Sequence, residues 1–173
     1  MAKLGRRPVT SIHRPVIVFL LKCVVFWAVA LLLVSRVPGV ERAGVQFTVA
    51  SLQGVFKLVR QPVERYGTAI SVAGTSVEIV SDCSPHMPYL IFAAVILAFP
   101  SSWRQKLLGL LFGAVVIHVF NVVRIVTLIW ILGWRRNWFE FAHVYLWQTG
   151  TILIVFITFA LWIRTVAPRP RST

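Results

Sequence analysis

Four long apolar stretches constrain the fold of this chain more than any other feature of its sequence. They cover residues 15–34, 85–100, 107–132 and 144–163. About 20 apolar residues in a helix cross the ~30 Å hydrocarbon core of a membrane, and the second stretch reaches that length only if the preceding Ser-Asp-Cys-Ser turn enters the headgroup layer. Hydrophobic residues make up 58% of the 173 residues, more than the roughly half found in soluble domains. The sequence therefore predicts an all-α integral membrane helical bundle, with about four transmembrane helices in one domain over residues 1–173.

The segment between the first two stretches, residues 36–83, is the only sizeable part outside the apolar stretches. From residue 45 to residue 59, apolar side chains recur at helical spacing, which predicts an amphipathic helix lying on the membrane surface. From residue 68 to residue 82, apolar side chains alternate around an Ala-Gly-Thr turn, which predicts a small β-hairpin leading into Cys83.

The basic residues predict an orientation in the membrane. The formal net charge is +13, but Lys and Arg flank the apolar stretches without forming a continuous basic face, so we expect anionic lipid rather than nucleic acid as their partner. If the N-terminus is cytoplasmic, inner segments 1–14, 101–106 and 164–173 hold nine basic residues in 30, and outer segments 36–83 and 133–143 hold seven in 59. The positive-inside rule then predicts a multi-pass protein of the cytoplasmic membrane with both termini in the cytoplasm. The first stretch is long and no small-x-small cleavage site follows it, so we interpret it as a retained anchor.

Cys83 is a candidate nucleophile. The chain has two cysteines, and Cys23 lies about nine residues into the first stretch, more than 10 Å deep at ~1.5 Å per residue. Cys83 is then an unpaired thiol in an oxidising compartment, where a free cysteine is a liability without a use. An intermolecular disulfide and an inert, half-buried thiol are the alternative interpretations.

Arg124 stands inside an apolar helix, where a charged side chain is costly and usually faces a polar cavity or a partner. It lies about 26 Å along the helix from Leu107, which places it near the outer interface at the level of Cys83. Asn121, three residues earlier, shares its helix face. The alternative is an interfacial Arg that contacts lipid phosphates.

His143 precedes the fourth stretch at the same predicted face, and imidazole is the side chain best suited to proton transfer near neutral pH. Among its aromatic neighbours it is alternatively an interface residue. The convergence of Cys83, Arg124 and His143 predicts a thiol active site at the outer membrane surface. His86, three residues after Cys83, would complete a zinc site with Cys83 and His143 only if a fourth ligand were present, and none is evident, so we expect no metal and no cofactor.

These residues also carry a family resemblance. The chain resembles the exosortase/archaeosortase family in the stretches SDCS, FPSSWRQKLLGLLFG, HVFNVVRIVTLIWILG and FEFAHVYLWQTGTILIVF, over about residues 75–165. The NxxR and AHxYLWQ segments are most similar to the short exosortase H type. Members commonly have Gly two positions after the Cys, and this chain has Pro85 there.

The resemblance implies a membrane-embedded cysteine transpeptidase. Its substrates would be exported proteins with a C-terminal motif, a transmembrane helix and a basic tail, cleaved at the outer membrane face through a thioacyl intermediate. A lipid or glycan acceptor would then receive the protein. Cys83 would be the nucleophile, His143 the base and then the acid, and Arg124 would stabilise thiolate or oxyanion, oriented by Asn121. A non-enzymatic assembly or lipid-binding subunit is the alternative from another class. A thiol–disulfide protein would need a CxxC pair, which the chain lacks, while a hydrolase differs only in using water as acceptor.

Overall fold

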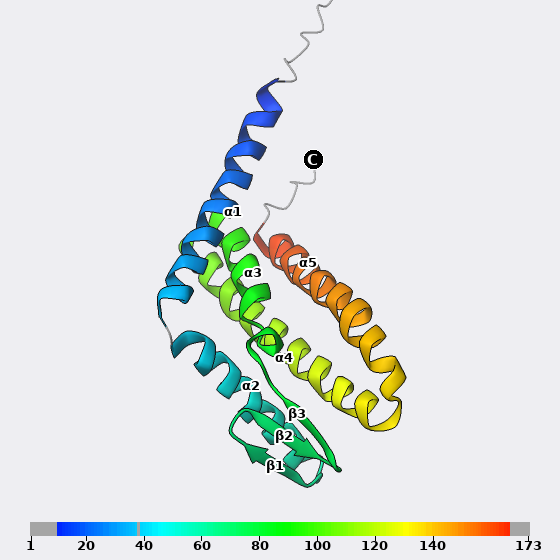
Figure 1. The fold of residues 1–173 in the computed structure, drawn as a ribbon. Helices are drawn as coiled ribbons and strands as arrows, with labels where there is room; N and C mark the ends of the chain where they lie inside the picture. Colours follow the sequence, from blue (N-terminus) through cyan, green and yellow to red (C-terminus); the bar gives the residue numbers. More distant parts are fainter. Residues whose placement is uncertain (1–9, 38, 167–173) are drawn as a thin grey trace, which may run out of the picture.

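The computed structural model describes residues 10–37 and 39–166 (Figure 1). Its helices and strands follow one another as α1 (Thr10–Arg36), α2 (Gly39–Leu58), β1 (Val63–Tyr66), β2 (Ala69–Val72), β3 (Thr75–Glu78), the 3₁₀ turn η1 (Ser81–Cys83), α3 (His86–Ala98), α4 (Trp103–Trp134), the 3₁₀ turn η2 (Arg136–Trp138), the π-helical segment η3 (Phe141–Leu146) and α5 (Trp147–Val166). Residues 1–9 and 167–173, whose basic side chains entered the orientation argument, lie outside the described residues.

Within residues 10–37 and 39–166, three helical segments are long and apolar enough to cross a membrane: Arg14–Arg36, Trp103–Trp134 and Arg136–Val166. They correspond to the first, third and fourth predicted stretches and confirm a helical membrane bundle. Over the second stretch the structure has the 13-residue helix α3, which at ~1.5 Å per residue is about 20 Å long. The second predicted stretch, which is already the shortest in the sequence, is thus a shorter apolar helix beside the three candidate spans.

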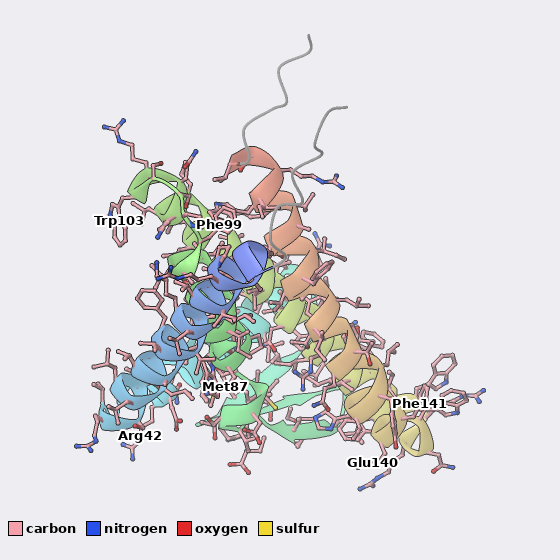
Figure 2. The ribbon with its side chains drawn as sticks, turned by 90° about the horizontal axis from the view of Figure 1, so that it is seen from above. Arg42, Met87, Phe99, Trp103, Glu140 and Phe141 are labelled. Atoms are coloured by element: carbon pink, nitrogen blue, oxygen red, sulfur yellow. The ribbon has the colours of Figure 1, made fainter. Side chains whose placement is uncertain are left out.

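α3 ends early because of local sequence signals. Phe99, which follows it, is in an extended conformation, as expected for a residue before proline. Ser102 then caps α4, since its side chain accepts from the Gln105 amide while the Gln105 side chain accepts from the Ser102 amide. This capping box fixes a tight turn between α3 and α4. Figure 2 shows Phe99 and Trp103 together at this turn, far from Glu140 and Phe141 at the other end of the molecule.

In the membrane bundle, large side chains of α3 and α5 pack directly against glycines of α4. A cluster that we call the bundle cluster (Phe92, Ile96, Ile117 and Trp162) joins α3, α4 and α5. A Cβ atom at Gly113 would overlap the Phe92 ring, and one at Gly109 would overlap the Trp162 indole. Glycine at these two positions of α4 is therefore what allows α3 and α5 to approach it.

The helix predicted over residues 45–59 is confirmed as part of α2, but its environment differs from the prediction. Its apolar face is buried in protein rather than laid on lipid. Together with the sheet and α4, α2 forms a cluster that we call the insert cluster. The buried members of this cluster are Val45, Val49, Leu52, Phe56, Ile70, Val72, Ile79, Val122, Ile125 and Ile129. Helical spacing predicts an apolar face correctly but does not say whether lipid or protein covers it.

The predicted hairpin is confirmed as β2 and β3, which pair antiparallel with Val72 opposite Thr75. Its two-residue turn has positive φ at Ala73 (49°) and Gly74 (80°), as primed hairpin turns require. A third strand, β1, extends the sheet in the order β1-β2-β3 and was not predicted. Figure 1 shows this sheet at the opposite end of the molecule from the start of α1 and the end of α5.

Candidate functional site

A cavity of about 540 Å³ lies among α3, α4, η3 and α5 and contains the candidate catalytic groups Arg124 and His143. Asp82, the residue before Cys83, lines it as well. The rest of the wall is mostly apolar and comes from α3 and from one face of η3 and α5 (Met87, Pro88, Ile91, Val144, Gln148, Thr151, Ile152 and Val155). The cavity therefore joins a polar end to an apolar groove.

Arg124 contributes unpaired hydrogen-bond donor capacity to this cavity. It is partly buried, and its Nε atom is buried without a hydrogen-bond partner. Buried polar groups are normally hydrogen-bonded, and an unsatisfied one marks a place where a ligand or water completes the site. The guanidinium is thus available to an anionic group that enters the cavity.

His143 lies on the π-helical segment η3, between the turn η2 and α5. Its ring stacks on Phe139, with centroids 5.6 Å apart and planes 8° from parallel. The wider π turn changes the direction of side chains relative to a regular helix and is frequent at functional sites. Stacking restrains an imidazole that would otherwise rotate freely, so the ring is held at the cavity wall.

The Cys83 backbone is fixed by Asn121. The Asn121 side-chain amide, 5% exposed, donates a hydrogen bond of 2.8 Å to the Cys83 carbonyl oxygen. The Cys83 amide donates to the Val80 carbonyl, 3.0 Å away, within the 3₁₀ turn. The Asn121 amide thus bonds the backbone of Cys83, and the orientation of Arg124 by Asn121 stays a prediction. This bond nevertheless places Cys83 within one turn of α4 from Arg124, the level at which it was predicted.

The Cys83 side chain does not line the cavity. It is partly buried and packs against the insert cluster, while Asp82 on one side of it faces the cavity. The structure thus brings Arg124 and His143 together, and it places Cys83 beside them with its thiol directed elsewhere.

Cys23 lies apart from this site, as predicted. It faces α3 across a small cavity that Ile91, Ala94 and Val95 also line. Both cysteines are free. Among the described residues, no group of three or more His, Cys, Asp or Glu side chains is close enough to hold a metal ion. The zinc alternative with His86 therefore has no ligand set in this part of the chain.

Sequence reasoning missed three polar residues of the cavity wall, namely Asp82, Gln148 and Thr151. Asp82 carried a signal as the immediate neighbour of Cys83. Gln148 and Thr151 carried another, because they are polar residues in an apolar stretch and three residues apart, on the same face of α5. The Thr151 hydroxyl donates to the Trp147 carbonyl, 2.8 Å away, which leaves its oxygen able to accept.

Comparison with known proteins gives a match to a family model. The sequence model of the transmembrane exosortase family (Exosortase_EpsH) matches residues 1–163. No curated protein and no solved structure matches the chain.

Proposed function

The chain belongs to the transmembrane exosortase family, and on this premise we propose that it is a membrane-embedded cysteine transpeptidase acting through Cys83, Arg124 and His143. The observation that supports the proposal most is the single cavity lined by Arg124 and His143, with Cys83 held next to it by Asn121. Three residues from separate parts of the sequence are brought to one level of the membrane bundle.

In the proposed first step, the Cys83 thiol rotates about χ1 from the insert cluster into the cavity. His143 takes its proton, the thiolate attacks a backbone carbonyl of the substrate, and His143 returns the proton to the leaving amine. The products are a thioacyl enzyme and the released C-terminal signal peptide. In the second step a nucleophile attacks the thioacyl carbon and restores the thiol.

Arg124 would stabilise the negative charge that appears on sulfur and then on the tetrahedral oxygen. A cation ~4 Å from an anion contributes about 4 kcal/mol at an effective dielectric constant of ~20. The orphaned Nε of Arg124 is a donor that such an anion can satisfy. Electrostatic stabilisation of this kind is commonly the largest single term in acyl-transfer catalysis.

We further propose that the sheet end of the molecule faces outward and that both termini are cytoplasmic. The start of α1 and the end of α5 both lie on the side of the molecule away from the sheet (Figure 1), and their described residues include the basic side chains Arg14 and Arg164. This arrangement suits a protein of the cytoplasmic membrane that contacts anionic lipid at its inner face.

The proposed substrates are exported proteins with a C-terminal motif, a transmembrane helix and a basic tail, and the proposed acceptor is a lipid or glycan with an amine or hydroxyl. The cavity is consistent with such a substrate, because its polar end continues into an apolar groove along α3 and α5. A reactive peptide bond would lie at the polar end and the adjoining apolar segment in the groove.

The test is co-expression of the chain with an exported protein that carries such a signal, comparing wild type with Cys83→Ala by intact mass. We expect Cys83-dependent loss of the C-terminal helix together with added mass on the new C-terminus. Loss of the helix without added mass would identify a hydrolase. Unprocessed substrate in wild type, over several candidate signals, would refute the proposal.

The alternative is a non-enzymatic membrane assembly or lipid-binding subunit, which is favoured by one observation. The Cys83 thiol packs in the insert cluster rather than in the cavity. Pro85 also replaces the glycine common in the family, and it stands directly before α3 as its N-cap. Complementation with Cys83→Ser separates the two functions, since an assembly role tolerates this change and a thiol nucleophile does not.

A further inference from the structure

A second cavity, which we call the Ser84 cavity, is lined by the residue that follows Cys83 in the sequence. It has a volume of about 210 Å³ and is lined by Ser84, Pro85, His86 and Tyr89 together with residues of α2 and α4 (Gly44, Phe47, Ala114, Ile117 and His118). Asp82 lines the first cavity and Ser84 lines the second, so the two sequence neighbours of the nucleophile candidate Cys83 reach different cavities. The proposed first step uses no group of the Ser84 cavity.

Two polar atoms are buried at the Ser84 cavity without partners. Ser84 is only 5% exposed and its Oγ makes no hydrogen bond. The Nδ1 atom of His86 is likewise buried and unpartnered. The great majority of buried polar side-chain atoms in folded proteins are hydrogen-bonded, and exceptions indicate a bound water, ion or ligand. Two such atoms on neighbouring residues of one cavity indicate a site for a small hydrogen-bonding group.

The other imidazole of this cavity, His118, is already engaged. Its Nε2 lies 3.0 Å from Ser51 Oγ, and that hydroxyl lies 2.8 Å from the Phe47 carbonyl, its acceptor. The single Ser51 proton is used on the carbonyl, so the His118 ring donates to Ser51. The Phe47 ring also packs on His118, with centroids 4.6 Å apart. Nε2 of His118 is thus already paired, whereas Nδ1 of His86 is buried without a partner.

The close approach of α2 shapes the cavity at Ser84. A Cβ atom at Gly44 would lie 2.8 Å from Ser84 Oγ. Water occupies ~30 Å³ in the liquid, so the cavity has about seven times the volume of one water. It therefore has room for the polar end of a larger molecule and not for a whole lipid or oligosaccharide.

We propose that the Ser84 cavity receives the nucleophilic hydroxyl or amine of the acceptor, and that His86 is the base that activates it. This inference rests on the proposed transpeptidase function and assigns its second step. After the Cys83 side chain has turned back from the first cavity, the acceptor oxygen or nitrogen forms a bond to the thioacyl carbon as its proton passes to His86 Nδ1. The carbon–sulfur bond breaks, the electron pair leaves on Cys83 sulfur as thiolate beside Arg124, and the proton on His86 returns through solvent. The acyl group has then moved from Cys83 to the acceptor, with no oxidant or reductant required.

The experiment separates the two steps with the full chain in lipid nanodiscs, a substrate bearing the C-terminal signal, and ethanolamine as the acceptor probe. Signal release reports the first step, and intact mass reports the thioacyl enzyme and the ethanolamine adduct. His86→Asn keeps a polar group near the Nδ1 position but cannot take a proton. We expect one equivalent of signal to be released at the wild-type rate, the thioacyl enzyme to accumulate, and adduct formation to fall by about 10²-fold, as for loss of a general base.

Ser84→Ala tests binding rather than proton transfer. We expect a rise of at least severalfold in the ethanolamine KM with unchanged signal release, because the hydroxyl in the cavity is lost. Ser81→Ala is the matched control, since Ser81 begins the 3₁₀ turn that Ser84 caps but lines neither of these two cavities. It should behave as wild type in both steps.

Wild-type adduct formation by His86→Asn would overturn the inference, and so would an equal fall in signal release and adduct formation. Free acid formed in place of adduct, with the same dependence on His86, supports the cavity and identifies water as its nucleophile. Absence of signal release in wild type is a different result, because it refutes the proposed function itself and this inference with it.

Discussion

The two ends of α4 are packed by different means. Toward its C-terminus, Val122, Ile125 and Ile129 meet α2 and the sheet through aliphatic side chains of similar size. Toward its N-terminus, Gly109 and Gly113 receive the large rings of α5 and α3. The first contact is a conventional soluble core, and the second is a close helix approach typical of membrane bundles. The candidate site lies where the insert cluster and the bundle cluster meet. Substitutions can therefore disturb each cluster separately, and the effect of each on the site can be measured.

The largest effect is expected in the bundle cluster from Gly113→Leu. A Cβ at this position would overlap the ring of Phe92, which is 1% exposed and has no space into which to turn. We expect a cost above the ~1–3 kcal/mol of ordinary overpacking, with loss of folded protein in detergent, measured by fluorescence-detected gel filtration.

The control for this change is Gly54→Leu in α2. A Cβ there meets nothing within 4 Å, and leucine has a better helix propensity than glycine by up to about 1 kcal/mol. Equal damage from both substitutions would show that the helices do not depend on close approach at Gly113.

The next effect is expected in the insert cluster from Leu52→Ala. Leu52 of α2 is fully buried against the sheet and α4. Truncating such a buried leucine to alanine lowers the free energy of unfolding by about 2–5 kcal/mol. We expect hydrogen exchange to accelerate in α2 and the strands while α3 and α5 stay protected. Leu58→Ala, at a side chain that is 83% exposed, should leave exchange unchanged. Uniform loss of protection would mean that the two clusters unfold as one unit.

A smaller effect is expected from Asn121→Leu, at the boundary between the insert cluster and the bundle cluster. This change removes the donor to the Cys83 carbonyl and leaves that oxygen without its partner, a cost of about 1–3 kcal/mol. Processing should fall by up to about 10²-fold, because small displacements of reacting groups are costly. Alkylation of Cys83 by a maleimide, resolved from Cys23 by peptide mass, should be faster than in wild type.

Thr127→Val is the matched control for Asn121→Leu, since the Thr127 hydroxyl donates only to the Val123 carbonyl of its own helix. Unchanged Cys83 alkylation and processing in Asn121→Leu would contradict a positioning role for Asn121.

The sequence predicted the elements that depend on local pattern and missed those that depend on tertiary contacts. Apolar length predicted the three long helices, and alternation predicted the β2–β3 hairpin. β1 was missed because Val63–Tyr66 reads Val-Glu-Arg-Tyr, in which no apolar residue alternates with a polar one. Its membership of the sheet comes from pairing with β2, a tertiary contact that local pattern does not encode.

The candidate site shows the same limit. The position of Arg124 along its helix followed from a rise of ~1.5 Å per residue, and the structure places it at the level of Cys83 through the Asn121 bond. The direction of the Cys83 thiol could not be predicted, because it depends on how η1 turns between α2 and α4. The burial of Ser84 and of the Nδ1 atom of His86 has the same origin.

The smallest effect is expected from the hydrogen bond between Ser51 of α2 and His118 of α4. Removing one partner should cost more than removing the other. Ser51→Ala leaves the His118 ring N–H without an acceptor, whereas His118→Leu leaves Ser51 still donating to the Phe47 carbonyl. A hydrogen bond contributes about 0.5–1.5 kcal/mol net, but an orphaned buried donor costs about 1–3 kcal/mol.

Ser51→Ala should therefore destabilise the protein more than His118→Leu through this hydrogen bond, and the double variant should cost less than the sum of the two. Thermal unfolding in one detergent measures all three variants. Ser35→Ala is the control, because its hydroxyl is exposed and donates within its own helix. Additive costs would mean that Ser51 and His118 are not coupled through this hydrogen bond.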